Sequence, residues 1–151
     1  MKFSSRKSPS FTLIIYGMNL FLLCVIFVGY NDHQEEFNEI IWTDLLLFLI
    51  VGFLFWVYHD TSYKITKKYF KYRSGPIRGK IELSRIKEII KGKTLWTGLK
   101  PATASKGLII KYDKYEQIYI SPQSNDEFIE QILQRNNNVR ILAREEVDFL
   151  K

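Results

Sequence analysis

The chain has 151 residues, a formal net charge of +6 and a single cysteine, Cys24, so an intrachain disulfide is excluded. It contains no P-loop, G-x-G-x-x-G, H-E-x-x-H or C-x-x-C motif, and its two histidines leave both a Ser-His-Asp and a Cys-His set incomplete. We therefore predict a protein that is not an enzyme and that uses no cofactor and no metal.

Two apolar runs follow a short basic tail, residues 1–10. The first, residues 11–30, reads FTLIIYGMNLFLLCVIFVGY and carries no charge; the second, residues 40–59, carries one acidic residue, Asp44. About 20 helical residues cross a hydrocarbon core of about 30 Å, and backbone groups in lipid must be paired within the segment. We predict two transmembrane helices at these positions.

The charges that flank the two runs predict their orientation. Lys and Arg are retained on the cytoplasmic side of a membrane. Residues 1–10 contain only basic charges, and residues 31–39 contain only acidic ones. Five basic residues follow the second run: Lys64, Lys67, Lys68, Lys71 and Arg73. We predict that both ends of the chain are cytoplasmic and that residues 31–39 form a short external acidic loop.

Three alternatives compete with parts of this interpretation. The first run could be a cleaved signal peptide, but it exceeds the usual apolar length of about 7–15 residues and no A-x-A-like site follows it. Both runs could be core helices of a soluble protein. Asp44 could mark a transport path, but a carboxylate one turn inside the membrane, beside Trp42 and Thr43, can also reach the headgroups.

Residues 60–151 are long enough for one small cytoplasmic domain. Alternating or β-rich segments predict strands at residues 61–65, 69–74, 79–83, 107–112 and 117–121. Residues 86–90 are ambiguous between a strand and a short helical turn. A Gly-Pro pair predicts the turn after the second strand, and residues 113–116 join the last two strands as a hairpin.

One amphipathic helix is predicted after these strands. Ser124 and Glu127 have the spacing of a capping box, in which each side chain can bond a free backbone N–H. An apolar stripe follows at helical spacing: Phe128, Ile129, Ile132 and Leu133. Residues 136–138, all Asn, end the helix, and residues 139–151 form either one more strand or a short helix. The fold class is a membrane helical hairpin followed by a PH-like small antiparallel β-barrel or sandwich, with a C-terminal capping α-helix (α+β).

Several stretches of the region 62–141 also carry a resemblance to a known family. They are SYKITKKYFKYRSG, LSRIKEII, PATAS and IYISPQSNDEFIEQILQRNNNVRI. In these the chain resembles the bacterial PH-like domain of YyaB-like membrane proteins, although that family often has Asn-Pro where this chain has three Asn. The resemblance implies a PH-like fold in a bacterial inner (plasma) membrane protein, and it implies no ligand, because this fold carries many unrelated functions.

The basic charge is concentrated next to the second apolar run. Residues 61–100 contain 12 Lys and Arg against 2 Asp and Glu. The strand phases predict an outward basic face made of Lys64, Lys71, Arg73 and Lys80, with Arg78 in the adjoining loop. Such a face either contacts anionic phospholipid or reflects only positive-inside topology and solubility. We predict no nucleic-acid partner, because no aromatic-basic recognition signature occurs and the membrane accounts for the charge.

A second candidate surface is the loop at residues 93–105. An exposed Trp96 beside Lys100 could anchor a protein partner or enter the headgroup region; alternatively, the Trp closes the end of the barrel. The sequence therefore favours a non-catalytic interaction or scaffold module at the membrane surface, with an unidentified protein partner. The alternative is a protein that protects against membrane-active peptides, or an accessory subunit of a transporter. It rests on four acidic residues that could meet a cationic peptide: Asp32, Glu35, Glu36 and Glu39.

Overall fold

The computed structural model describes residues 1–32, 37–95 and 98–143, and the chain divides into two compact units. One unit is Pro9–His59, and the other combines Met1–Ser8 with Asp60–Lys151. The helical unit is thus an insertion in the sequence of the other unit, which we call the domain. The predictions for Glu35, Glu36 and residues 144–151 lie outside the described residues.

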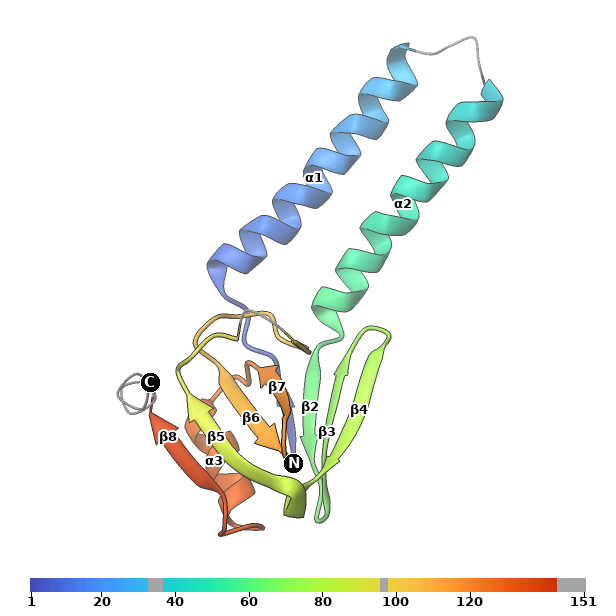
Figure 1. Cartoon of the computed structure of the whole chain (residues 1–151). Helices are drawn as coiled ribbons and strands as arrows, with labels where there is room; N and C mark the ends of the chain where they lie inside the picture. The colour runs from blue at the N-terminus through green and yellow to red at the C-terminus, as the bar shows by residue number, and fades with distance from the viewer. Residues whose placement is uncertain (33–36, 96–97, 144–151) are drawn as a thin grey trace. The chain divides into compact units, whose positions relative to one another are not determined.

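The helical unit consists of α1 (Pro9–Asp32) and α2 (Phe37–His59), which run antiparallel (Figure 1). Both helices are long and apolar enough to cross a membrane, as the sequence predicted. Tyr58 links them, because its hydroxyl lies 2.7 Å from that of Thr12. Only 6% and 11% of the residues in the two apolar windows are buried, which does not fit core helices of a soluble domain.

The first sheet of the domain has four antiparallel strands in the order β1-β2-β3-β4. Their bounds are Lys2–Ser4, Ser62–Ile65, Tyr69–Ser74 and Ile77–Glu82. The strands β2 and β3 agree with the strands predicted from the sequence. The sequence predicts a separate tail at residues 1–10, but Lys2–Ser4 of this tail forms β1, the first strand of the domain.

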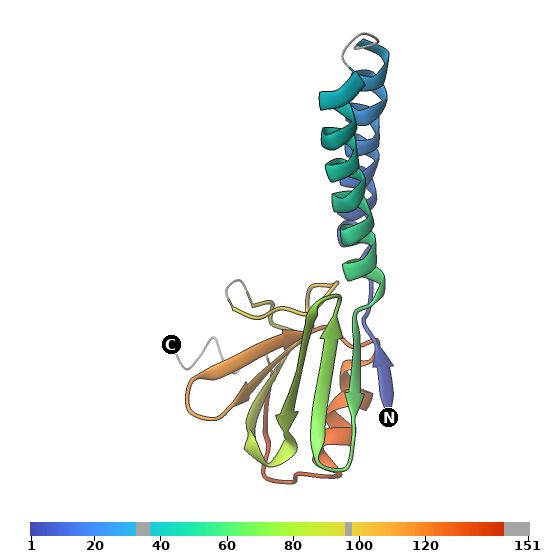
Figure 2. The same ribbon diagram turned by 90° about the vertical axis from the view of Figure 1, so that its right-hand side faces the viewer.

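The second sheet has the order β7-β6-β5-β8, and a short 3-10 turn, η1 (Leu83–Arg85), leads into it from β4 (Figures 1 and 2). Its strands are β5 (Ile86–Lys91), β6 (Leu108–Tyr112), β7 (Glu116–Ile120) and β8 (Arg140–Ala143). The ambiguous segment at 86–90 is therefore a strand. The strand β8 pairs parallel with β5, which departs from the predicted antiparallel series. The connection through the intervening helix returns the chain in the same direction as β5.

One core joins the two sheets and α3 (Asn125–Leu133). Phe128 of α3 is fully buried, and its ring lies 5.3 Å from that of Phe3 and 5.5 Å from that of Phe70, both in edge-to-face geometry. Isoleucines from the second sheet complete the cluster. The helix face predicted to be apolar is thus the buried one, and β1 contributes to the same core.

The N-terminus of α3 shows the Ser124 half of the predicted capping box. The Ser124 side chain accepts a hydrogen bond from the backbone N–H of Glu127 at 3.3 Å. Loss of such a cap costs about 1 kcal/mol. We expect Ser124→Ala to lower the free energy of unfolding by about 1 kcal/mol, measured by urea-dependent proteolysis of the full chain in detergent. The exposed Ser84→Ala is the control, and equal stabilities of the two variants would contradict the capping role.

Candidate functional site

A row of lysines crosses the outer face of the first sheet. Each lysine is the direct Cα partner of the next: Lys2 with Lys64, Lys64 with Lys71, and Lys71 with Lys80. All four side chains are exposed, whereas their neighbours along the strands, such as Phe3 and Phe70, point into the core. Neighbouring strands lie about 4.8 Å apart. The four lysines, here called the lysine row, therefore start from closely spaced positions in a line across the sheet.

Two arginines lie on the same face, two residues nearer to the β3–β4 turn along each strand. Arg73 and Arg78 are direct Cα partners and both are exposed; we call them the arginine pair. The sequence predicts Arg78 in a loop, and this prediction is wrong, because β4 begins at Ile77. The turn contains only Gly75 and Pro76, and Gly75 has a φ of 56° that glycine adopts without strain.

The charges on this face are only partly compensated. Arg73 donates through Nε to the Asp60 carboxylate at 2.5 Å, and Lys68 pairs with Glu82 at 3.5 Å. Lys80 lies 5.5 Å from the centre of the Tyr69 ring, a cation–π contact. Within the described part of the chain, no member of the lysine row makes an ion pair. Because no ion pair among the described residues offsets it, the positive charge of the lysine row is unbalanced. Like charges directly opposite each other also destabilise a sheet.

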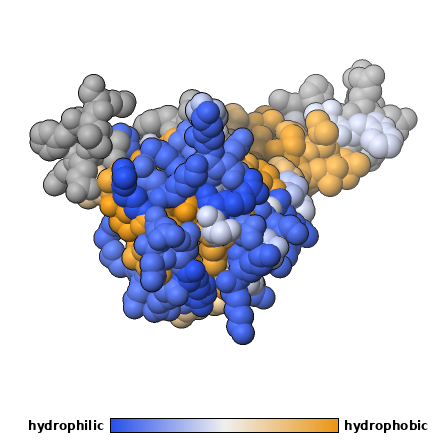
Figure 3. All heavy atoms as spheres, turned by 60° about the horizontal axis from the view of Figure 1, so that its bottom comes forward, coloured by the Kyte–Doolittle hydropathy of each residue, from blue (hydrophilic) through white to orange (hydrophobic). Residues whose placement is uncertain are grey.

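The surface of the domain is also polar away from this row. Figure 3 shows one face of the molecule on which hydrophilic residues cover most of the domain, with smaller hydrophobic areas between them. The part of the domain seen in this view therefore presents no broad apolar surface to a partner.

The second candidate surface is only partly described. Trp96 lies outside the described residues, so its proposed roles stay predictions. Lys100 is exposed, while its neighbours are held in place: Leu99 accepts a backbone hydrogen bond from Tyr119 at 3.0 Å, and Pro101 is buried. This part of the loop covers the edge of β7, because Leu99 forms a bridge with Ile118.

The strand phases alone correctly placed Lys64, Lys71, Arg73 and Lys80 on one face. Sequence reasoning missed Lys2, which completes the lysine row from β1. Its only local signal is the order Lys-Phe-Ser, an exposed, a buried and an exposed residue, which is too short to predict a strand.

The two sheets, their shared core and α3 are consistent with a PH-like domain. A family model described as "Bacterial PH domain" matches residues 61–136, half of the chain, and the chain belongs to this family. It is also similar to "Uncharacterized protein YyaB" of Bacillus subtilis (strain 168), with 27% identity over 101 residues, 66% of this chain and 69% of that protein. No solved structure matches the chain. The predicted YyaB-like PH domain family is thus confirmed, and a family of this kind supports a non-catalytic module.

The lysine row makes a testable statement about stability. Lys71 lies between Lys64 and Lys80, so Lys71→Glu converts two like-charged cross-strand pairs into opposite-charged ones. We expect the variant to be more stable than the wild type by about 0.5–1 kcal/mol in low salt. Urea-dependent proteolysis of the full chain in detergent measures this difference. The gain should shrink in high salt, and Lys114→Glu on the β6–β7 turn is the control. A stability equal to or below the wild type would contradict repulsion within the row.

Proposed function

We propose that this protein is a non-catalytic module anchored in the bacterial plasma membrane, whose basic face contacts anionic phospholipid at the cytoplasmic surface. The observation that carries the proposal is the line of directly opposed, exposed lysines on the first sheet. The arginine pair lies on the same face. Such a field destabilises the free domain and is relieved by an anionic surface.

The pairing of β1 with β2 supports the topology. The chain leaves the domain after Ser8 and returns at Asp60, yet β1 and β2 are hydrogen-bonded neighbours. Both ends of the helical insertion must then lie on the same side of a membrane, which requires an even number of crossings. The basic residues before α1 and after α2 favour the cytoplasmic side, so both termini are cytoplasmic in this proposal.

Chain connectivity also orders the cations by their reach to the membrane. Asp60 directly follows His59, the last residue of α2. At about 3.3 Å per residue, Ser62, the strand partner of Arg73, lies within about 7 Å of Asp60, and Lys64 within about 13 Å. Screening reduces electrostatic attraction over about 8 Å at physiological salt. The arginine pair is therefore tethered closest to the membrane, and the proposal requires the face to incline toward the lipid so that the lysine row also contributes.

The proposed domain architecture is a PH-like sandwich in which α3 covers one open end. The contacts of Phe128 with rings of the first sheet, and of α3 with the common core, support this arrangement. A PH-like fold does not by itself identify a ligand, because proteins that share one fold have many unrelated functions. The lipid contact therefore rests on the charges of this chain and not on its family.

Lysine reactivity in the full chain tests the proposal. The protein is placed in nanodiscs of phosphatidylcholine alone or with phosphatidylglycerol, and acylation of each lysine is followed by mass spectrometry. Attraction of about 1 kcal/mol per lysine predicts that phosphatidylglycerol slows labelling of Lys64, Lys71 and Lys80 about fivefold. High salt should remove the effect, and Lys114 is the control that stays unchanged. Equal labelling of the row in both nanodiscs would overturn the lipid contact.

A further inference from the structure

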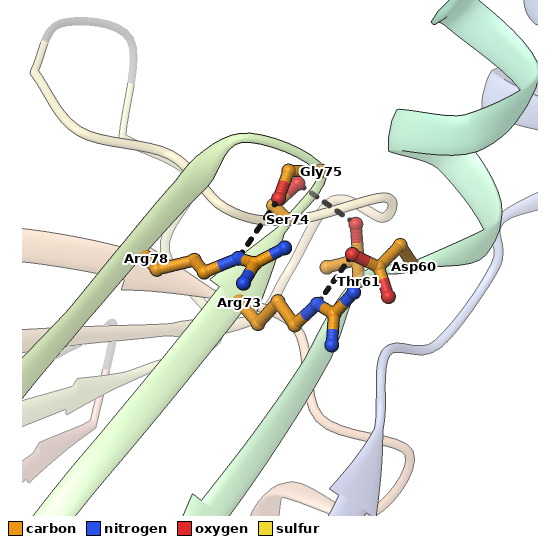
Figure 4. Close-up of polar contacts among 6 residues, drawn as sticks. All are labelled: Asp60, Thr61, Arg73, Ser74, Gly75 and Arg78. Carbon is orange, nitrogen blue, oxygen red and sulfur yellow. Dashed lines mark hydrogen bonds and ion pairs between the residues drawn. The ribbon is translucent and has the colours of Figure 1, made fainter.

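The turn end of the β3–β4 hairpin holds two guanidinium groups in a fixed arrangement. Arg73 and Arg78 start from directly opposed positions; in Figure 4 the Arg78 side chain reaches toward the turn at Gly75, and the Arg73 side chain extends toward Asp60. The Nε of Arg73 is bonded to Asp60 at 2.5 Å, and the Nε of Arg78 approaches the carbonyl oxygen of Gly75 at 3.5 Å. Each guanidinium is thus oriented through the nitrogen nearest to its own chain.

The outer nitrogens of both groups are left for a ligand. Among the described residues, no hydrogen bond engages the terminal nitrogens of Arg73 or Arg78. The backbone beneath is fixed by a buried bond of 2.9 Å between the hydroxyls of Thr61 and Ser74, which ties β2 to the end of β3. Two positive groups face a single carboxylate here, so one positive charge remains uncompensated.

The chemistry of the pair favours phosphate over other anions. A guanidinium is a planar fork that bonds two phosphate oxygens at once, whereas an ammonium acts as a point charge. Two such forks on adjacent strands can grip one phosphate group from two sides. The lysine row has no such geometry and attracts any anionic surface. The same basic face thus combines a diffuse field with one directional site.

We infer that the arginine pair is a phosphate-binding site filled by the phosphate of a lipid headgroup, with Asp60 as the residue that positions Arg73. This inference rests on the proposed function for the source of the phosphate. One observation favours lipid: Asp60, the partner of Arg73, directly follows the last residue of α2.

The test uses the full chain in dodecyl maltoside, a detergent whose headgroup is a sugar and contains no phosphate. Modification of Arg73 and Arg78 by a dicarbonyl reagent is followed by mass spectrometry after three additions: phosphatidylglycerol, oleate at the same micelle charge, or inorganic phosphate. Charge-assisted hydrogen bonds of about 1.5–3 kcal/mol predict that phosphatidylglycerol slows modification about tenfold or more. Oleate, a carboxylate, should leave it nearly unchanged.

Two variants separate the directional site from the diffuse field. Arg78→Lys keeps the charge and removes one fork, so protection of Arg73 by phosphatidylglycerol should be lost while lysine labelling stays as in the wild type. Lys80→Gln removes a charge and leaves both forks, so protection of Arg73 should persist.

The outcomes of this test are distinct from a failure of the proposed function. Equal protection by oleate and phosphatidylglycerol would overturn the phosphate site, and so would unchanged protection of Arg73 in the Arg78→Lys variant. Slower lysine labelling with both lipids would still support the basic face. Protection by inorganic phosphate as strong as that by phosphatidylglycerol would keep the phosphate chemistry and overturn lipid as its source.

Discussion

Replacing Phe3 by Ala is expected to destabilise the domain by about 3–5 kcal/mol, a large part of the stability of a small domain. Phe3 is 94% buried in the common core, since its exposed fraction is 6%, and its ring packs edge-on against Phe128 of α3. Its removal leaves a cavity between β1 and the helix. Urea-dependent proteolysis of the full chain in detergent measures the loss, with cleavage sites assigned to the domain by mass spectrometry.

Ser4→Ala is the matched control, because Ser4 belongs to the same strand and points outward. It should change the free energy of unfolding by less than about 0.5 kcal/mol. If Phe3→Ala also cost less than this, β1 would not be part of the folded domain, and Lys2 would not belong to the lysine row. The result therefore tests both whether β1 is part of the folded domain and whether the basic face includes Lys2.

The same strand shows where sequence reasoning ends. The strands β2, β3, β6 and β7 could be predicted because alternation, a Gly-Pro turn and a short hairpin connection are local signals. The strand β1 has three residues, and its partner strand β2 follows in the sequence only after both long helices. Nothing within its own sequence distinguishes it from a basic tail, because its stability comes entirely from the core and from a distant strand.

The C-terminal strand presents a different difficulty. The sequence left residues 139–151 open between a strand and a helix, and β8 (Arg140–Ala143) is a strand parallel to β5. A parallel partner is reached through the preceding helix and has no hairpin turn that would fix its register. The sequence pattern alone therefore cannot decide whether such a segment is a strand or a helix.

The basic face was predictable in its phase and not in its full extent. The exposed positions of β2, β3 and β4 follow from alternation, which places Lys64, Lys71 and Lys80 outward. Their direct opposition follows from register, which the two-residue turn at Gly75 and Pro76 determines for β3 and β4. The arginine pair likewise exists only because this turn is short enough to bring Arg78 into the strand.

The second large effect is expected from Tyr63→Phe, which removes the centre of a buried polar cluster. The Tyr63 hydroxyl donates to the carbonyl oxygen of Pro101 at 2.5 Å and accepts from the backbone N–H of Ser121 at 3.1 Å. It also lies 3.1 Å from the hydroxyl of Ser5. Through these bonds, the segment after β1 is joined to β2, to the loop before β6 and to the end of β7.

Phenylalanine fills almost the same volume, so the cost arises from polar groups that lose their partner. Each such buried group costs about 1–3 kcal/mol, and two backbone groups are affected. We expect Tyr63→Phe to lower the free energy of unfolding by about 2–4 kcal/mol, measured by the same proteolysis experiment. Tyr115→Phe is the control, because this side chain is 84% exposed. A loss as small as that of the control would show that the cluster adds no stability.

The pH dependence gives an independent reading of the same residue. Burial raises the pKa of the Tyr63 hydroxyl above its usual value, although hydrogen bonds from Ser121 and Ser5 act in the opposite direction. The neutral hydroxyl is therefore favoured in the folded state, and its contribution is complete below the unfolded pKa of about 10. As the pH rises from there through the folded pKa, the unfolded chain ionises first and stability falls. The wild type should thus lose stability above about pH 10 more steeply than Tyr63→Phe, and parallel pH profiles of the two would contradict a buried, neutral Tyr63.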